Sequence, residues 1–249
     1  MNRFIEGRSL RRPMCPICAG PPCESVERYW YRCASCDLLW DHSSPLDARD
    51  ILYSVRLGKM PDGAQFDPKE DKIADALAGK EATGRQDRLR LAMSMSGVSG
   101  GALTEIGFGG AQALKWAKDG GQWSRVLGIE INSEYVAFAC SLGLEAVYLD
   151  VSTKQWDPPG SFDLVFASEV MEHMPDPVAF VWGARRLLAP AGKLWLSFAA
   201  VNGRAKLDQG EWQYWSQTAV ERLAEAARLS VNVCQTAVAG SVIYASLRL

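Results

Sequence analysis

Residues 103–110 read LTEIGFGG, a short apolar run that ends in glycines and is followed by the helix-like stretch AQALKWAK. Glycines at the junction of a strand and a helix let a ligand come close to the backbone. Outward from this stretch, short apolar runs alternate with helical patterns. We expect strands at 102–106, 125–131, 145–149, 162–167 and 193–198, and helices at 111–118, 133–142 and 177–188. This alternation predicts an α/β protein whose parallel sheet is covered by helices on both faces.

The end of the chain follows a different pattern. Ser216 is a good N-cap for a helix that runs to residue 229, and two strands are expected at 231–238 and 242–249. Two strands joined by so short a connection must pair antiparallel. The predicted sheet is therefore mostly parallel, with an antiparallel strand at its C-terminal end.

Five of the seven cysteines lie within residues 15–36. Four of them form two Cys-x-x-Cys pairs, a spacing that suits a tetrahedral Zn²⁺ ion held by four thiolates. Two disulfides are a weaker alternative, because the number of cysteines is odd and residues 1–13 contain no apolar signal core. Redox catalysis by Cys-x-x-Cys normally needs only one such pair. We expect a small zinc ribbon whose ligands are Cys15, Cys18, Cys33 and Cys36, with Cys23 as a buried residue or a substitute ligand.

The composition is that of an ordinary globular protein. Of the 249 residues, 48% are hydrophobic and 22% are charged, and the net charge is −2, which excludes a disordered or collagen-like chain. The slightly acidic balance argues against electrostatic binding of nucleic acid over the whole surface, although it leaves a local basic patch open. No apolar run is long enough to span a membrane. We expect a cytoplasmic protein without a membrane partner.

We divide the chain into three parts: the zinc-binding module at 1–45, a helical linker or cap region at 46–98, and the main domain at 99–249. The middle part has helical patterns at 69–77 and 85–95. In the second of these, an apolar stripe that includes Leu89 and Ala92 is expected to be buried, with Arg85, Arg88 and Arg90 mostly outside it.

Three acidic residues stand where the first three predicted strands of the main domain end. Glu105 precedes the first glycine by two residues, a position where a carboxylate would repel a pyrophosphate and attract a cationic ligand. The third position of the dinucleotide fingerprint is Gln112 instead of glycine. Glu130 can accept hydrogen bonds from both hydroxyls of a ribose, and Asp150 can accept one from an adenine amino group. S-adenosylmethionine, which has an ammonium and a sulfonium and no phosphate, fits this set of residues.

Two further segments complete a family pattern: FDLVFASEVMEHMPDP at 162–177 and LLAPAGKL at 187–194. With the glycine loop and the three acids, they resemble the class I S-adenosylmethionine-dependent methyltransferases. The first segment is similar to that of small-molecule O- and C-methyltransferases of quinone and natural-product pathways. The resemblance covers about residues 103–249 and implies a seven-stranded Rossmann-like methyltransferase sheet with an antiparallel last strand. A four-cysteine zinc module before this fold is similar to the sugar C-methyltransferases and their relatives.

The resemblance also implies roles for individual residues. Glu105 and Gly107 would hold the methionine end of the cofactor, and Glu130 would bind its ribose. The adenine would lie against the ends of the second and third strands, and the sulfonium would lie beside the end of the fourth. Ala111 stands where many members have a third glycine. The implied cofactor-binding residues are Glu105, Gly107, Gly109, Glu130, Ile131, Asp150, Val151, Ala167 and Ser168.

His173 follows the predicted strand at 162–167 and is the candidate general base for O-methylation, or an aid to enolisation in C-methylation. Its alternative role is to brace the loop. Glu172 and Glu169 are alternative bases. The aromatic segment EWQYW at 211–215 forms either a lid over the acceptor or a contact with the zinc module. The predicted function is methyl transfer to a small-molecule acceptor, at a hydroxyl or activated carbon of a sugar, quinone or natural-product intermediate.

Two alternatives remain open. In the first, the zinc ribbon and the N-terminal arginines dock on RNA, and the protein is an RNA methyltransferase. In the second, the chain is an adaptor without catalytic activity. The complete set of acids and glycines argues against this second alternative. The arginines in question are Arg3, Arg8, Arg11 and Arg12.

Overall fold

The structure, a computed structural model, describes residues 13–20, 23–27, 30–41, 82–152, 156, 160–201, 213–237 and 240–249. Several sequence predictions fall outside these residues. They are the helix at 69–77, the arginines that precede residue 13, and residues 211 and 212 of the aromatic segment.

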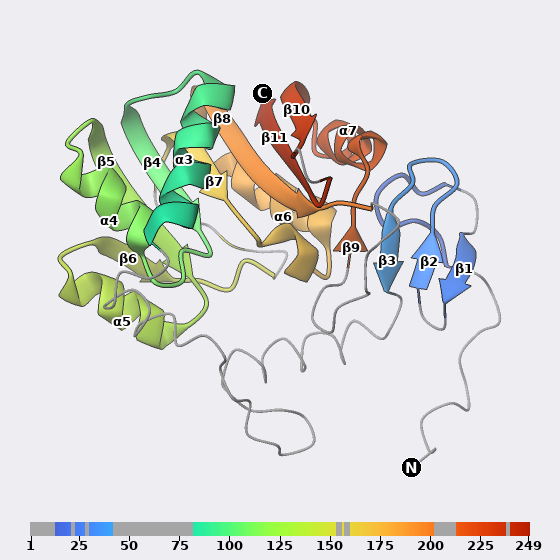
Figure 1. Cartoon of the computed structure of the whole chain (residues 1–249), viewed down its shortest axis with the longest axis horizontal. Helices are drawn as coiled ribbons and strands as arrows, with labels where there is room; N and C mark the ends of the chain where they lie inside the picture. The colour runs from blue at the N-terminus through green and yellow to red at the C-terminus, as the bar shows by residue number, and fades with distance from the viewer. Residues whose placement is uncertain are drawn as a thin grey trace, which may run out of the picture.

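A seven-stranded sheet with the order β10-β11-β8-β7-β4-β5-β6 forms the centre of the molecule (Figure 1). Strands β4 to β8 run parallel to one another, and β11 pairs antiparallel with both of its neighbours. This arrangement confirms the predicted α/β fold with a mostly parallel sheet and an antiparallel last strand. The strands are β4 Gly101–Ile106, β5 Trp123–Glu130, β6 Glu145–Tyr148, β7 Phe162–Ala167, β8 Leu188–Ala199, β10 Ser230–Thr236 and β11 Val242–Arg248.

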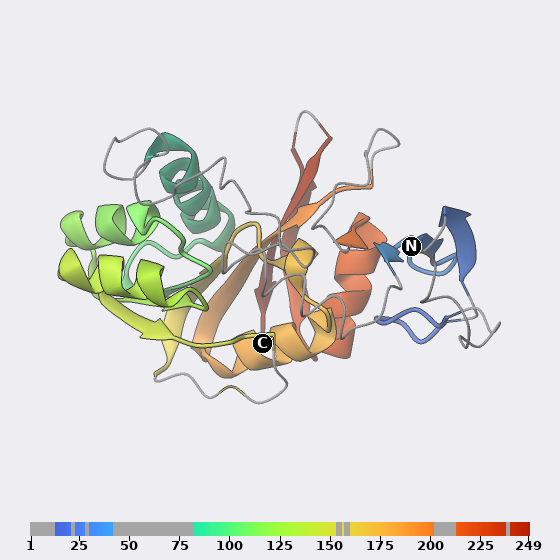
Figure 2. The ribbon, with the colours of Figure 1, turned by 90° about the horizontal axis from the view of Figure 1, so that it is seen from below.

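Helices cover both faces of this sheet (Figures 1 and 2). Leu164 and Phe166 of β7 belong to the apolar cluster that includes Leu89 of α3, whereas Val165 belongs to the cluster that includes Phe180 of α6. Because both faces are buried, apolar residues dominate β7 instead of alternating with polar ones. The helices are α3 Ala82–Ser96, α4 Gln112–Asp119, α5 Ser133–Ser141, α6 Pro177–Arg186 and α7 Gln217–Ala226.

None of the helices in the part of the chain that the structure describes has both the length and the apolar character that a membrane span requires.

Strand β8 begins at Leu188, five residues before the start predicted from the sequence. The Pro190–Gly192 segment that was expected to precede the strand lies within it, opposite a register shift between Phe162 and Leu164 of β7. A Cβ atom at Gly192 would lie 2.5 Å from the Phe162 carbonyl oxygen, so only glycine allows this close approach.

The N-terminal cysteine module forms a second, four-stranded sheet with the order β1-β2-β3-β9. Three strands are its own: β1 Glu24–Glu27, β2 Trp30–Arg32 and β3 Leu39–Asp41. The fourth, β9 Gln213–Tyr214, comes from the C-terminal part of the chain and pairs antiparallel with β3 (Figure 1). The buried cysteines belong to the same apolar cluster as the buried residues of α6 and α7, such as Phe180 and Val220. The module is thus closely packed against the main domain, and the division at residues 45 and 98 remains a prediction.

Candidate functional site

The glycine loop continues from β4 across the carboxyl end of the sheet. Gly107 has a φ of +74° and donates its backbone N–H to the Ile129 carbonyl at 2.8 Å. A Cβ atom at Gly107 would lie 2.7 Å from the Val170 side chain. Gly109 and Ala111 also have left-handed backbone conformations, with φ values of +53° and +60°. Ala111 therefore occupies a conformation that favours glycine, which accounts for the preference for a third glycine there.

Glu130 fixes this loop to the end of β5. Its Oε2 accepts a hydrogen bond from the Gly109 N–H at 3.1 Å, and its Oε1 accepts from Ile131 N at 2.8 Å and Asn132 N at 3.1 Å. The side chain is buried. The structure thus places the predicted ribose acceptor directly against the glycine loop.

Asp150 lies at the neighbouring strand end. The Leu149 N–H donates to the Glu130 carbonyl at 2.9 Å, which holds the end of β6 beside the end of β5. Asp150 Oδ1 accepts from the backbone N–H of Ser152 at 2.9 Å and from its hydroxyl at 2.6 Å, and Val151 is buried. The residues predicted for the ribose and the adenine are therefore brought to adjacent positions.

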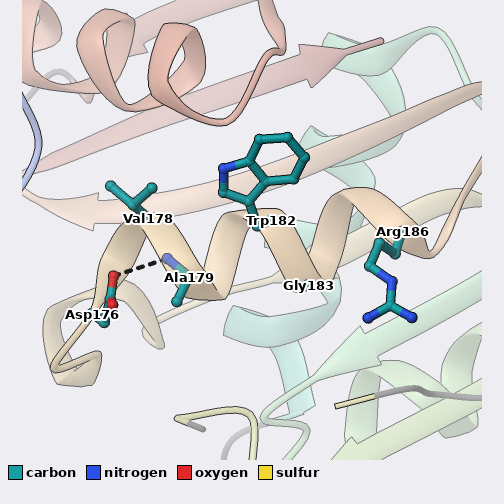
Figure 3. A pocket seen from close by; sticks show the side chains of 6 residues that line it. All are labelled: Asp176, Val178, Ala179, Trp182, Gly183 and Arg186. Atoms are coloured by element: carbon teal, nitrogen blue, oxygen red, sulfur yellow. Dashed lines mark hydrogen bonds between the residues drawn. The ribbon is translucent and has the colours of Figure 1, made fainter. Parts of the chain in front are cut away.

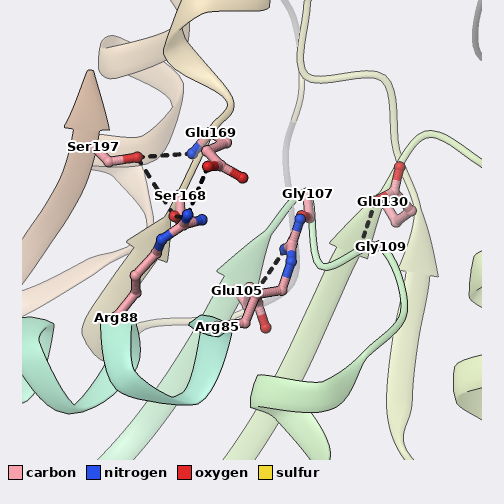
Figure 4. A network of polar contacts seen from close by, with 9 residues as sticks. All are labelled: Arg85, Arg88, Glu105, Gly107, Gly109, Glu130, Ser168, Glu169 and Ser197. Carbon is pink, nitrogen blue, oxygen red and sulfur yellow. Dashed lines mark hydrogen bonds and ion pairs between the residues drawn. The ribbon is translucent and has the colours of Figure 1, made fainter. Parts of the chain in front are cut away.

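Glu105 is almost completely buried and lies beside Arg85 of α3, with 3.4 Å between Oε1 and Nη1 (Figure 4). The same Nη1 donates to the Gly107 carbonyl at 3.1 Å. Burial raises the pKa of Glu105 to about 7, although the nearby Arg85 acts in the opposite direction. The charge of Glu130 raises this pKa further. Glu105 is thus a carboxyl group that a cationic ligand would readily ionise.

The expectation that Arg85 lies outside the buried stripe is wrong, because its side chain is buried against the glycine loop. Arg88, one turn later, also points to the carboxyl edge of the sheet (Figure 4). Its Nη1 donates to Ser168 Oγ at 3.3 Å, and its Nη2 lies 2.7 Å from Glu169 Oε1. Sequence reasoning missed both arginines as site residues, because their spacing of three residues places them on one helix face without saying what that face contacts.

The end of β7 carries the residues predicted to lie near the sulfonium. Ala167 and Ser168 are buried, and Glu169 follows with a left-handed φ of +57°. The Glu169 N–H donates to Ser197 Oγ at 2.8 Å, which holds this turn against β8. Such a backbone conformation is unfavourable for a non-glycine residue and is often found at functional sites.

A short 3₁₀ helix, η1 Met171–His173, follows this turn. Its first hydrogen bond runs from His173 N to the Val170 carbonyl at 3.1 Å. Glu172 is buried and His173 is half-buried. The structure places both candidate bases on the segment that leaves the carboxyl end of β7, while Glu169 is paired with Arg88.

The four predicted zinc ligands form a compact cluster. Their sulfur atoms all lie within 4.8 Å of one another, with 3.6 Å between Cys15 and Cys36 and 3.5 Å between Cys18 and Cys33. These separations are much longer than an S–S bond of about 2.05 Å, and they are close to the edge of a ZnS₄ tetrahedron with Zn–S bonds of about 2.3 Å. The donor set therefore fits Zn²⁺. Cys23 is buried nearby, outside the set of four, and desolvation by burial raises its pKa to about 12.

The described part of the aromatic segment packs against the cysteine module. Tyr214 and Trp215 are buried, and the Tyr214 ring lies 5.5 Å from that of Trp30 between centroids. For residues 213–215, the structure thus supports contact with the module instead of a lid. His42, the histidine that follows the cysteine module and the only one besides His173 in the sequence, lies outside the described residues.

A hollow of about 330 Å³ lies along α6, away from the glycine loop (Figure 3). It is lined by Trp182 and Arg186, among others, and by none of the residues predicted to bind the cofactor.

Comparison with known proteins gives a consistent result. Residues 104–196 match the family model described as "Methyltransferase domain". A ubiquinone biosynthesis O-methyltransferase from Pseudomonas aeruginosa (strain UCBPP-PA14) is 30% identical over 118 residues, which are 45% of this chain and 50% of that protein. The protein of the same name from Xanthomonas oryzae pv. oryzae (strain PXO99A) is 35% identical over 156 residues, 55% of this chain and 64% of that protein. This chain therefore spans between half and two thirds of these relatives.

Among solved structures, an S-adenosylmethionine-dependent methyltransferase from Clostridium acetobutylicum has a similar fold. The TM-score is 0.58, with 10% identity, and the match covers 71% of this chain and 96% of that one. The family match, the fold and the arrangement of the glycine loop and strand-end acids agree. Residues 104–196 thus match a methyltransferase domain, and the chain has the fold of the S-adenosylmethionine-dependent methyltransferase from Clostridium acetobutylicum.

Proposed function

We propose that this protein transfers a methyl group from S-adenosylmethionine to a small-molecule acceptor. The observation that carries the proposal is the arrangement of three carboxylates, Glu105, Glu130 and Asp150, at the carboxyl ends of three neighbouring strands around one glycine loop. Ligands of open α/β sheets bind at this edge. A phosphate-bearing cofactor is disfavoured there by the negative charge.

The methionine end of the cofactor would lie between Glu105 and Arg85. An amino acid has an ammonium and a carboxylate on one carbon atom, and the Glu105–Arg85 pair offers the complementary charges 3.4 Å apart. On binding, Glu105 would contact the ammonium of the cofactor and Arg85 would contact its carboxylate, in place of their contact with each other. Glu130 would accept hydrogen bonds from the ribose hydroxyls, and Gly109 would allow the close approach.

The other predicted positions complete the cofactor site. Ile131, Asp150 and Val151 lie at the ends of β5 and β6, where the adenine would bind. Ala167 and Ser168 lie at the end of β7, where their backbone would face the sulfonium. When bound, the cofactor supplies a methyl group on a positively charged sulfur.

His173 would act on the acceptor. The two bacterial relatives are named as O-methyltransferases, which favours a hydroxyl as the acceptor group in this chain as well. An imidazole nitrogen of His173 would take the hydroxyl proton as the oxygen gains its methyl group. Glu172, buried beside it in η1, is the alternative base.

We further propose that Cys15, Cys18, Cys33 and Cys36 hold one structural Zn²⁺ ion. Their sulfur separations and the chemistry of four thiols support this ligand set. A cytoplasmic location, where such thiols stay reduced, also remains a prediction.

Two measurements test the proposed function. Calorimetry with S-adenosylmethionine tests the cofactor, and labelled-methyl transfer into the fractions of a cell extract tests the acceptor class. Label in a small-molecule fraction would support the proposal. Label in RNA would support the RNA methyltransferase instead, and cofactor binding without transfer into any fraction would support the adaptor without activity.

A further inference from the structure

Strand β9 lies between the cysteine module and the segment that carries His173. Leu39 and Trp40 of β3 pair with Tyr214 and Gln213 of β9, so β9 is the edge strand of the module's sheet. On the main-domain side, β9 contacts both η1 and β8. A displacement of β3 in the module would therefore reach η1 through β9, which contacts both of them.

The contact with η1 is made by the side chain of Gln213. This residue is 3% exposed, and its Nε2 donates to the Met174 carbonyl at 2.6 Å. Met174 is the C-cap of η1 and follows His173 directly. The Gln213 Oε1 atom is buried and has no hydrogen-bond partner among the described residues. An apolar side chain would fill this space without the free-energy cost of burying an amide oxygen that has no hydrogen-bond partner. The hydrogen bond donated to Met174 therefore explains why the residue is a glutamine.

Both ends of this connection are held in place. Trp215 N donates to the Ala199 carbonyl at 2.7 Å, and Val201 N donates to the Trp215 carbonyl at 2.8 Å, which ties β9 to the end of β8. Ser216, the N-cap of α7, donates its hydroxyl to the Cys36 carbonyl at 2.8 Å. The backbone carbonyl of Cys36, one of the proposed zinc ligands, is thus hydrogen-bonded to Ser216, two residues after the end of β9.

We propose that Gln213 is a positioning residue for His173, and that the four-cysteine module sets the place of η1 through β9. The inference rests on the proposed function for the roles of zinc and of His173. The connection itself consists of the β3–β9 pairing and one buried side-chain hydrogen bond. Loss of the metal would loosen β3, then β9, and would release the Met174 carbonyl from Gln213.

The test reads the environment of His173 directly. The chain has two histidines, so a carbon–proton NMR spectrum of the imidazole rings has two sets of signals, which a His42→Gln variant assigns. Gln213→Met keeps the length of the side chain and removes the donor. We expect this variant to keep its zinc and its affinity for S-adenosylmethionine within about twofold, and to shift or broaden the His173 signals. Removal of zinc from the wild-type chain should move the same signals, with a smaller effect in Gln213→Met.

Gln217→Met is the matched control, because Gln217 is an exposed residue of α7 whose amide donates to the Thr236 hydroxyl of β10 instead of to η1. It should leave the His173 signals unchanged. A merely structural role of Gln213 would lower the melting temperature without moving these signals. His173 signals that coincide with those of the wild type in folded, zinc-loaded Gln213→Met would overturn the inference. Failure of the proposed function would be seen separately, as a lack of S-adenosylmethionine binding by the wild-type chain.

Discussion

The cysteine module and the glycine-loop site, which comprises the glycine loop, the strand-end acids and the side chains around them, would hold their proposed ligands in opposite ways. In the module, the four donor atoms are side-chain sulfurs from residues 15–36, and the surrounding strands have only three or four residues each. At the glycine-loop site, backbone groups of Gly107 and Gly109 take part in the hydrogen bonds, and the side chains come from α3, from β4 and β5, and from the turn after β7. The module should therefore depend on its ligand for its fold, whereas the glycine-loop site should keep its shape without one.

The largest expected effect is the loss of a zinc ligand. Structural Zn²⁺ contributes about 10–16 kcal/mol to folding in zinc-finger peptides, and the module has little core of its own. Cys36→Ser should lower zinc from one ion per chain to much less than one, and should unfold β1 to β3 while the seven-stranded sheet stays folded. Elemental analysis and circular dichroism check both parts. Cys140→Ser, at an exposed cysteine of α5, should keep its zinc; full retention of zinc by Cys36→Ser would contradict the assignment.

The second prediction concerns catalysis beside the glycine-loop site. If His173 is the general base, His173→Asn should lower turnover by about 10²–10⁴-fold, with almost no change in cofactor affinity. The wild-type rate should fall as the pH drops through the pKa of the imidazole, and the variant should lose this acid limb. Steady-state kinetics over a range of pH, with the acceptor identified by label transfer, measures both effects. A variant with normal turnover and the same acid limb would remove His173 from the mechanism.

Glu105 should make binding of the cofactor at the glycine-loop site dependent on pH near 7. Its pKa of about 7 in the folded protein, raised by burial, means that a cofactor ammonium must displace a proton below that pH. Affinity for S-adenosylmethionine should rise as the pH increases through 7, with proton release that calorimetry in two buffers detects. Glu105→Gln should bind weakly at every pH. An affinity that stays constant between pH 6 and 8, a range of roughly one unit on either side of this pKa, would show that Glu105 does not meet the ammonium.

The same shift has a consequence for stability without ligand. A carboxyl whose pKa is raised on folding favours the folded state at low pH and loses that contribution as the pH rises from its unfolded value toward 7. The loss amounts to at most on the order of 3 kcal/mol. Glu105→Gln should therefore be more stable than the wild type at pH 8 and similar to it near pH 4.5, the ordinary value of a glutamate. Denaturant titration at the two pH values measures this, and Glu221→Gln on the exposed side of α7 is the control.

The smallest expected effect is that of Glu130→Ala. The variant loses the proposed ribose acceptor and also the acceptor of the Gly109 N–H, and hydrogen bonds to charged groups contribute about 1.5–3 kcal/mol each. Affinity for S-adenosylmethionine should fall by about tenfold or more. The exposed Glu134→Ala on α5 should bind normally. Unchanged affinity in Glu130→Ala would mean that the adenosine lies elsewhere.

Much of the fold could be read from the sequence, because the buried parallel strands are apolar runs bounded by turn residues. The strand at 162–167 was predicted to the residue. Strand β9 could not be predicted, since two residues have no periodicity and the partner strand lies more than 170 positions earlier in the chain. The early start of β8 was missed because a proline and a glycine normally interrupt a strand.

The candidate site was predictable to a similar extent. Its acids and glycines follow predicted strands, so their positions at one edge of the sheet could be inferred. Arg85 and Arg88 could not be assigned, because the direction in which a helix points its charged side chains depends on how it docks on the sheet. The cysteine cluster was found from spacing alone, since a zinc ribbon needs only local sequence to bring its ligands together.

Strand β9 also limits how this chain can be dissected. If residues up to 41 were removed, the backbone groups of Gln213 and Tyr214 that pair with β3 would become an open strand edge, and the Tyr214 ring would lose its contact with Trp30. Open edges next to apolar surface promote aggregation. The methyltransferase domain expressed alone should therefore fold but associate with itself. We therefore expect the cysteine module to keep the domain soluble by covering this strand edge.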